Sequence, residues 1–182
     1  MVTRVAITGF GRIGRLTLRA LLESKRKDIK LVALNAAGTP DSVAHLFEYD
    51  SIHGRYQGNI KTTQSSINFG NGAVKLVSAR DPKDLPWKEL DVDVVLECTG
   101  AFSTKEQSMA HIDAGCKRVL ISAPTKTADL TVVYGVNHTK LRKGHQVVSN
   151  ASCTTNALAP LVSVLDKKIG IENGFMTTVH AY

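Results

Sequence analysis

A glycine-rich segment close to the start of the chain most constrains how it can fold. The apolar run Val5–Thr8 is typical of a buried parallel strand, and it leads directly into Gly9–Gly14, a complete G-x-G-x-x-G. Leucines and an isoleucine then recur at roughly helical spacing as far as the basic cluster at 25–27. A strand, a glycine turn and a helix in this order predict a dinucleotide-binding unit.

Each glycine of this segment has a separate expected role. Gly9 makes the tight turn, Gly11 lets the backbone approach a pyrophosphate, and Gly14 permits close packing of the helix on the strand. The pyrophosphate is then expected on the free N–H groups at the start of the helix.

The tip of the second strand bears on the choice of cofactor. A strand over 30–35 ends in Asn35-Ala36-Ala37-Gly38-Thr39-Pro40, and the first acidic residue is Asp41. An NAD site usually carries a carboxylate here for the ribose hydroxyls. Without one, nothing repels a 2′-phosphate, and Asn35 and Thr39 could donate to it. NADP is therefore expected to be accepted and preferred over NAD, although Asn35 and Gly38 can also simply form a turn.

Strand and helix signals alternate along the chain, which predicts an α/β fold of the Rossmann type, a doubly wound and mostly parallel sheet. After the first two strands, further strands are expected at 92–96, 119–122, 131–134 and 146–149, with antiparallel excursions over 51–79 and helices around 44–47 and 107–114. Ligands of such sheets bind at the carboxyl ends of the strands. The expected neighbours of the cofactor are Asn35, Ala36, Arg80, Thr99, Gly100, Ser122 and Ala123. Arg80 could equally be an exposed salt-bridge partner.

A second constellation lies near the end of the chain. Cys153 stands among small polar residues where a strand runs into a helix, and His180 follows downstream. A thiol at a helix N-terminus is stabilised as the reactive thiolate, and an imidazole can serve as its base. The alternative is an ordinary buried cysteine.

Composition narrows the function further. The chain has 182 residues, 43% of them hydrophobic, with a net charge of +7. This charge suits anionic ligands such as NADP and sugar phosphates, whereas the scattered basic residues argue against nucleic acid. The sequence has no run long enough to span a membrane, and its three cysteines lack paired spacing, as expected for a reducing cytoplasm. Five histidines lack metal-ligand spacing and are expected to be exposed or locally hydrogen-bonded: His45, His53, His111, His138 and His145.

The chain resembles phosphorylating glyceraldehyde-3-phosphate dehydrogenases along essentially its whole length. The segments that carry the resemblance are Gly9–Gly14, Ala44–Leu46, Tyr49–Ser51, Arg80–Pro82, Glu97–Gly100, Ser149–Asn156 and Thr177–Tyr182. The octet Ser149–Asn156 around the cysteine and the histidine motif Thr177–Tyr182 are specific to this family and its near relatives. The glycine motif indicates only that a dinucleotide is bound.

The resemblance implies that Cys153 attacks the aldehyde of glyceraldehyde 3-phosphate and that His180 takes up a proton as hydride leaves for the nicotinamide. Inorganic phosphate then cleaves the resulting thioester. Ser152 and Thr154 match positions that bind substrate or phosphate. Four further matches concern the cofactor, with Arg12 and Ile13 at the pyrophosphate and Arg80 and Ser122 at other cofactor contacts. Ala36 replaces the family's usual aspartate and resembles the NADP-using branch.

The resemblance also implies a domain division, with a dinucleotide-binding domain at 1–150 and the incomplete start of an α+β catalytic domain at 151–182. A helix over 153–168 and a strand over 174–180 are expected in this second part. The family's catalytic domain continues further, so the chain alone is expected not to turn over, and a homotetramer is expected of the full-length enzyme. Two alternatives stay open, an erythrose-4-phosphate dehydrogenase and a non-catalytic dinucleotide-binding fragment.

Overall fold

The structure is a computed structural model, and it describes residues 2–180. Within these residues nine strands form one sheet, accompanied by four α-helices and two short 3₁₀ helices. The strands are β1 (Thr3–Thr8), β2 (Ile29–Asn35), β3 (Lys61–Thr62), β4 (Ser66–Asn68), β5 (Ala73–Val77), β6 (Val94–Glu97), β7 (Arg118–Ile121), β8 (Leu130–Thr131) and β9 (Val147–Ser149). The helices are α1 (Arg12–Glu23), α2 (Pro40–Glu48), α3 (Lys105–Asp113) and α4 (Cys153–Ile169), with 3₁₀ helices η1 (Pro82–Asp84) and η2 (His138–Lys140).

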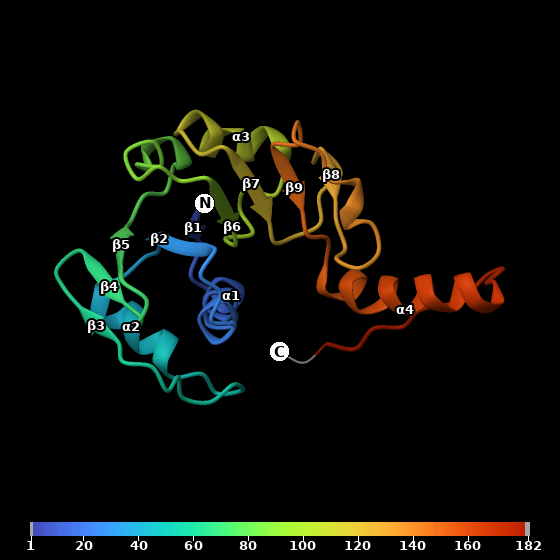
Figure 1. The fold of residues 1–182 in the computed structure, drawn as a ribbon, viewed down its shortest axis with the longest axis horizontal. Coiled ribbons are helices and arrows are strands. Elements are labelled where there is room, and N and C mark those ends of the chain that lie inside the picture. The colour runs from blue at the N-terminus through green and yellow to red at the C-terminus, as the bar shows by residue number, and fades with distance from the viewer. Residues whose placement is uncertain (1, 181–182) are drawn as a thin grey trace.

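The strand order shows that the sheet is doubly wound. The strands lie in the order β3-β4-β5-β2-β1-β6-β7-β9-β8, so the chain proceeds outward in one direction from β1 and later returns to its other side at β6 (Figure 1). All pairs from β5 to β8 along the sheet are parallel, whereas the β3–β4 and β4–β5 pairs are antiparallel. The predicted Rossmann-type α/β fold is confirmed. Its topological switch point lies between β1 and β6, where such folds bind ligands.

Two hydrophobic clusters cover the two faces of the sheet. Neighbouring β1 residues Ala6 and Ile7 belong to different clusters, because side chains alternate along a strand. α1 and α2 lie on the face whose cluster includes Phe47, and α3 lies on the face whose cluster includes Trp87 (Figure 1). Trp87, which follows η1, is fully buried in this second cluster and anchors its segment to the sheet.

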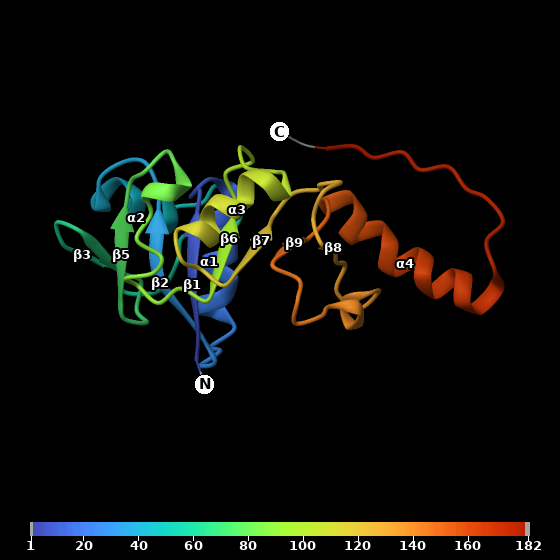
Figure 2. The same ribbon diagram turned by 90° about the horizontal axis from the view of Figure 1, so that it is seen from above.

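The chain after β9 leaves the sheet. α4 projects away from the other elements, and none of its residues is buried (Figures 1 and 2). The predicted helix is therefore confirmed, but the strand expected at 174–180 is wrong. Residues 170–180 run back along α4 without regular secondary structure. The physical reason is that a strand requires a partner ladder, and the described part of the chain supplies none there.

Candidate functional site

Two adjoining clefts open at the carboxyl edge of the sheet, on either side of the switch point. The first has a volume of about 740 Å³ and is lined by the glycine turn, the tip of β2 and the segments after β5 and β6. The second has a volume of about 410 Å³ and lies between the start of α1, the ends of β6 and β7 and the Cys153 turn. Cys98 lines both clefts, so one residue separates them.

The glycine turn is packed too tightly for side chains at two of its three glycines. Gly9 has φ +86°, and a Cβ there would lie 2.6 Å from the backbone nitrogen of Thr99. A Cβ on Gly14 would lie 2.1 Å from the carbonyl oxygen of Gly9, so the helix can approach the strand only without it. A Cβ on Gly11 would meet no atom within 4 Å, which leaves open space beside the backbone where a ligand could approach.

The start of α1 is open to an anionic ligand. Gly11 is its N-cap and supplies no side-chain hydrogen bond, so the first N–H groups of the helix lack a capping acceptor. Arg12 is exposed at this end, and Ile13 is half exposed in the second cleft. Below them, the buried hydroxyl of Thr8 has no hydrogen-bond partner in residues 2–180 and lines the first cleft. These groups fit a dinucleotide.

The tip of β2 differs from the expectation in one respect. The Asn35 amide donates from Nδ2 to the carbonyl oxygen of Ala79 and accepts from the Ala79 N–H at Oδ1, each at 3.0 Å. Its side chain thus joins the ends of β2 and β5, and one of its two amide N–H donors is already used there, which leaves one for a phosphate. Ala36, the next residue, is also buried and lines the cleft.

Three residues around the β2 tip determine which charged and polar groups a ligand would meet there. Thr39 caps α2 by accepting from the N–H of Ser42, and it is exposed. Asp41 accepts a 2.5 Å hydrogen bond from Thr62, on β3. The exposed Arg80 lines the cleft, and its guanidinium has neither a hydrogen bond nor an ion pair within residues 2–180, contrary to the salt-bridge alternative.

The loop after β6 forms the wall of the first cleft opposite the β2 tip. Thr99 and Gly100 are exposed in this loop, and Thr99 lines the cleft. His111 is expected from the sequence to be either exposed or locally hydrogen-bonded. It is not exposed, because it is completely buried behind this loop, and both of its ring nitrogens are hydrogen-bonded. Ser122, after β7, lines the second cleft together with Cys98 and Cys153.

The turn that carries Cys153 is strained and held by its own side chains. Ala151 has φ +60°, a left-handed conformation that costs a non-glycine residue about 1–2 kcal/mol. Its N–H donates to the Ser149 hydroxyl, which in turn donates to the carbonyl oxygen of Ala123 at 2.7 Å. Asn156 donates from Nδ2 to the carbonyl oxygens of Asn150 and Ser152 at 2.7 and 2.9 Å. We refer to these contacts as the Ser149–Asn156 latch.

The latch places Cys153 as the first residue of α4, exposed and at the rim of the second cleft. Ser152 is the N-cap and accepts from the Thr155 N–H at 3.0 Å. His180 is brought back to this helix end, where its Nε2 lies 3.4 Å from Thr154 Oγ1 and 2.8 Å from Thr178 Oγ1. Within residues 2–180 no hydrogen bond joins His180 to Cys153. The two residues of the predicted pair therefore lie at the same helix end without direct bonding.

The other two cysteines differ from Cys153 in burial. Desolvation raises the pKa of the Cys98 thiol to about 11, against a smaller opposing effect of its hydrogen bond with Ser122. Burial likewise raises the pKa of Cys116 to about 12. Both remain thiols at neutral pH, which leaves the exposed Cys153 as the accessible nucleophile among the cysteines.

Sequence reasoning missed the supporting residues of both clefts. Glu97 and His111 lie behind the first cleft, and Ser149 and Asn156 support the second. The sequence signal for the last two was their place in the polar octet around Cys153, whereas nothing in the sequence joined Glu97 to His111.

Residues 2–180 contain neither a metal-binding cluster nor a membrane-spanning helix. No group of three or more His, Cys, Asp or Glu side chains there could hold a metal ion. No described helix is both long enough and apolar enough to cross a membrane.

The fold and the first cleft define an α/β protein with a Rossmann-type dinucleotide-binding domain. Comparison with known families agrees, because residues 3–105 match the glyceraldehyde 3-phosphate dehydrogenase NAD binding domain, and residues 152–182 match the C-terminal domain of the same family. The chain belongs to the glyceraldehyde 3-phosphate dehydrogenase family.

Curated relatives extend the match over the whole chain. A glyceraldehyde-3-phosphate dehydrogenase of Xanthobacter flavus is 57% identical over 182 residues, which are 100% of this chain and 54% of that protein. The enzymes of that name from Cereibacter sphaeroides and Thermotoga maritima are 52% and 46% identical to this chain. Each of these matches covers all of this chain and 54% of the relative's length. The chain thus spans about half the length of these relatives.

Proposed function

We propose that this chain is the dinucleotide-binding and nucleophile-bearing part of an oxidoreductase. The reaction is the phosphorylating oxidation of D-glyceraldehyde 3-phosphate to 1,3-bisphosphoglycerate. One observation carries the proposal: an exposed cysteine, the first residue of α4, lies at the rim of a cleft that adjoins the proposed dinucleotide cleft through Cys98.

The chemistry assigned to the chain's own residues begins at Cys153. Its sulfur bonds to the aldehyde carbon, and the N–H groups at the start of α4 stabilise the oxygen anion that develops. This oxygen takes up the thiol proton through His180, which gives the hemithioacetal hydroxyl. His180 accepts the hydroxyl proton while hydride departs, which leaves a thioester on Cys153. An oxygen of inorganic phosphate then attacks the thioester carbon and releases the thiolate. Ser152 and Thr154, on either side of the nucleophile, are proposed to bind the substrate and this phosphate.

A nicotinamide dinucleotide, when bound, accepts the hydride. We assign the pyrophosphate to the helix start at Gly11, Arg12 and Ile13, and the nicotinamide to the second cleft beside Ser122 and Cys98. Gly9 and Gly14 hold the turn, Thr99 lines the opposite wall, and Gly100 is assigned to the cofactor as its neighbour in the same loop.

NADP is proposed as the preferred dinucleotide. Its extra phosphate needs a cationic site without a facing carboxylate, and the unpaired guanidinium of Arg80 lines this cleft. The nearest acid along the β2 tip, Asp41, is engaged by Thr62. The test is titration of NADP and NAD into the chain and into its Arg80→Gln variant. Selective loss of NADP affinity supports the assignment, whereas clearly tighter NAD binding to the unsubstituted chain would refute the preference.

The remaining assignments follow the family. We propose a division at residue 150, with residues 151–182 beginning the catalytic domain, and a cytoplasmic homotetramer for the full-length enzyme. Turnover is proposed to need residues that this chain does not contain, because the matched relatives are nearly twice as long.

The decisive experiment completes the chain at its carboxyl end with the corresponding residues of the Xanthobacter flavus relative. Reduced-nicotinamide absorbance is followed with glyceraldehyde 3-phosphate, phosphate and NADP, using Cys153→Ser as the control. Phosphate-dependent turnover that the control lacks is expected. Equal turnover in the control would refute the role of Cys153, and faster turnover of erythrose 4-phosphate would change the substrate. Dinucleotide binding without turnover in the completed chain would favour the binding-module alternative.

A further inference from the structure

We propose that Glu97 and His111 are positioning residues that hold the Thr99–Ala101 loop against the glycine turn in the geometry a dinucleotide requires. This inference rests on the dinucleotide site proposed above and assigns it a buried support. Neither side chain reaches the cleft, since Glu97 is 1% exposed and His111 0%.

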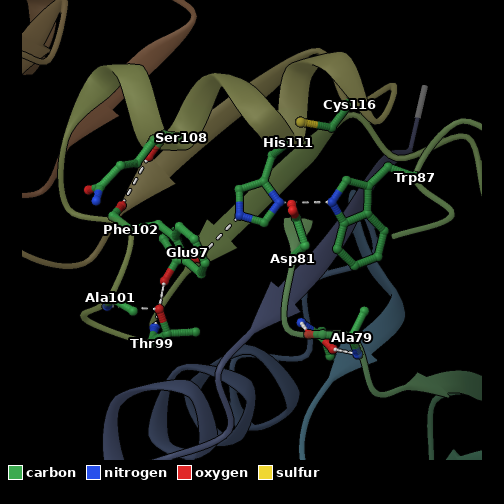
Figure 3. A network of polar contacts seen from close by, with 12 residues as sticks. Ala79, Asp81, Trp87, Glu97, Thr99, Ala101, Phe102, Ser108, His111 and Cys116 are labelled. Carbon is green, nitrogen blue, oxygen red and sulfur yellow. Dashed lines mark hydrogen bonds and ion pairs between the residues drawn. The ribbon is translucent and has the colours of Figure 1, made fainter. Parts of the chain in front are cut away.

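A continuous chain of hydrogen bonds joins the core to the cleft wall (Figure 3). The indole N–H of Trp87 donates to Nδ1 of His111 at 3.0 Å, and Nε2 of His111 lies 3.2 Å from Oε2 of Glu97. Oε1 of Glu97 accepts from both the backbone N–H, at 2.7 Å, and the hydroxyl of Thr99. The same hydroxyl accepts from the N–H of Ala101 at 3.0 Å. We call these five residues the relay.

The direction of every bond in the relay is fixed by chemistry. An indole nitrogen can only donate, so Nδ1 of His111 must be the acceptor and the ring proton must lie on Nε2. That proton is then donated to Glu97, whose carboxylate receives it on one oxygen and the two Thr99 donors on the other. The relay therefore needs a carboxylate at 97 and one tautomer at 111, and no other arrangement pairs all of its groups.

The far end of the loop is held by the same helix. Ser108, fully buried on α3, donates its hydroxyl to the carbonyl oxygen of Phe102 at 3.1 Å. The ring of Phe102 also meets that of His111 edge to face, with centroids 6.3 Å apart. α3 thus controls the loop at Thr99 through Glu97 and at Phe102 directly (Figure 3).

Movement of this loop would reach the glycine turn. Gly9 packs so closely that a Cβ on it would lie 2.6 Å from the Thr99 nitrogen and 2.8 Å from the Thr99 Cα. The N–H of Cys98 also donates to the carbonyl oxygen of Thr8, just before the turn, at 2.8 Å. Because backbone meets backbone here, a displaced Thr99 displaces the turn that presents the helix N-terminus to a pyrophosphate.

Burying the side chains of Glu97 and His111 costs free energy, and a positioning role explains why the core keeps them. Removing a carboxylate and an imidazole from water is unfavourable, and apolar residues of similar volume often stabilise a core equally well or better. Asp93, just before the other end of β6, provides a matched comparison. It also accepts from a backbone N–H, that of Arg4 at 2.8 Å, and from Lys117 at 2.6 Å, but it lies at the edge of the sheet away from both clefts.

The test compares NADP affinity of the chain with that of Glu97→Gln and Asp93→Asn, measured by calorimetric titration. An amide at 97 places a donor against either His111 or Thr99, so one contact of the relay is lost. Glu97→Gln is expected to bind NADP about tenfold more weakly, while Asp93→Asn is less stable but binds within about twofold of the unsubstituted chain. Equal binding by Glu97→Gln would overturn the relay alone. No NADP binding by the unsubstituted chain would instead overturn the proposed dinucleotide site.

A double substitution separates positioning from general damage. Trp87→Phe removes the donor that fixes the His111 tautomer, so the imidazole can then accept from an amide at 97. Glu97→Gln should therefore weaken NADP binding by only about threefold or less in the Trp87→Phe background, compared with about tenfold without it. Equal losses in both backgrounds would refute the relay. Should Glu97→Gln fail to fold, His111→Phe removes the support of Glu97 without touching the cleft and is expected to bind NADP more weakly than the unsubstituted chain, and equal affinity would overturn the inference.

Discussion

Asp129 provides a quantitative test of how the far edge of the sheet is held. Its Oδ2 accepts from the N–H groups of Gln146 and Val147, at 2.8 and 2.9 Å, where the chain enters β9. Its Oδ1 forms an ion pair with Lys105, the first residue of α3. The carboxylate thus joins three segments, and Asp129→Asn keeps its shape while removing its charge.

The magnitude follows from the pKa of this group. The Lys105 bond, followed by the Val147 N–H, lowers the Asp129 pKa from 3.8 to about 2. At roughly 1.36 kcal/mol per pKa unit, this difference corresponds to about 2.4 kcal/mol of stability. The Asp129 side chain is 17% exposed and that of Lys105 38%, so solvent screening reduces the expected value to about 1–2 kcal/mol.

The sign of the pH dependence is fixed by the depressed pKa. The contribution is complete above the unfolded value of 3.8 and is lost as the pH falls through about 2. Urea unfolding should therefore show Asp129→Asn destabilised by about 1–2 kcal/mol at about pH 6, with the difference shrinking toward zero near pH 2. Asp113→Asn, at an exposed carboxylate at the end of α3, is the control and should differ little at any pH. A constant difference for Asp129→Asn across this range would refute the reasoning.

Further expectations concern the turn, the cysteines and α4. Gly14→Ala places a methyl group 2.1 Å from the Gly9 carbonyl oxygen, so thermal unfolding should show a loss of about 1–3 kcal/mol, and an unchanged melting temperature would contradict that contact. Iodoacetamide at about pH 8 should label Cys153 and spare the two cysteines whose pKa burial raises to about 11 and about 12, with peptide mass spectrometry as the readout; comparable labelling of either buried cysteine would contradict those pKa values. The apolar side chains of Leu161 and Leu165 are 58% and 40% exposed on α4, so the isolated chain should self-associate in sedimentation, and replacing both by lysine should weaken this. Unaltered association would place the contact elsewhere.

The sequence was sufficient to predict the central fold because its signals there were local. The glycine segment, the apolar runs and the helical spacing after Gly14 each act within a few residues, and the β1–α1–β2 unit follows from them. The expected strand at 174–180 failed because extended propensity cannot supply a partner ladder. For the same reason β8 covers only Leu130–Thr131, whereas the sequence predicts a strand over 131–134.

In the candidate site, too, the features that depend on neighbouring residues could be predicted, whereas the contacts between distant residues could not. The position of Cys153 at a helix start and the tight packing of Gly9 and Gly14 could be inferred from motifs. The Asn35 clamp on Ala79 spans 44 residues. The bond from Glu97 to His111 is similarly a property of the folded sheet and helix. Pairings of this kind depend on which elements become neighbours in space, and a single sequence carries no local signal for them.

The Ser149–Asn156 latch has a consequence for hydrogen exchange. Its bonds lie within eight residues, apart from the one to Ala123, whereas no residue of α4 is buried as far as its end at Ile169. Local opening of the helix end therefore need not disturb the turn that carries the cysteine. Amide protons near Ile169 should exchange rapidly, and that of Ala151 slowly, so that the nucleophile occupies the rigid end of an otherwise fraying helix.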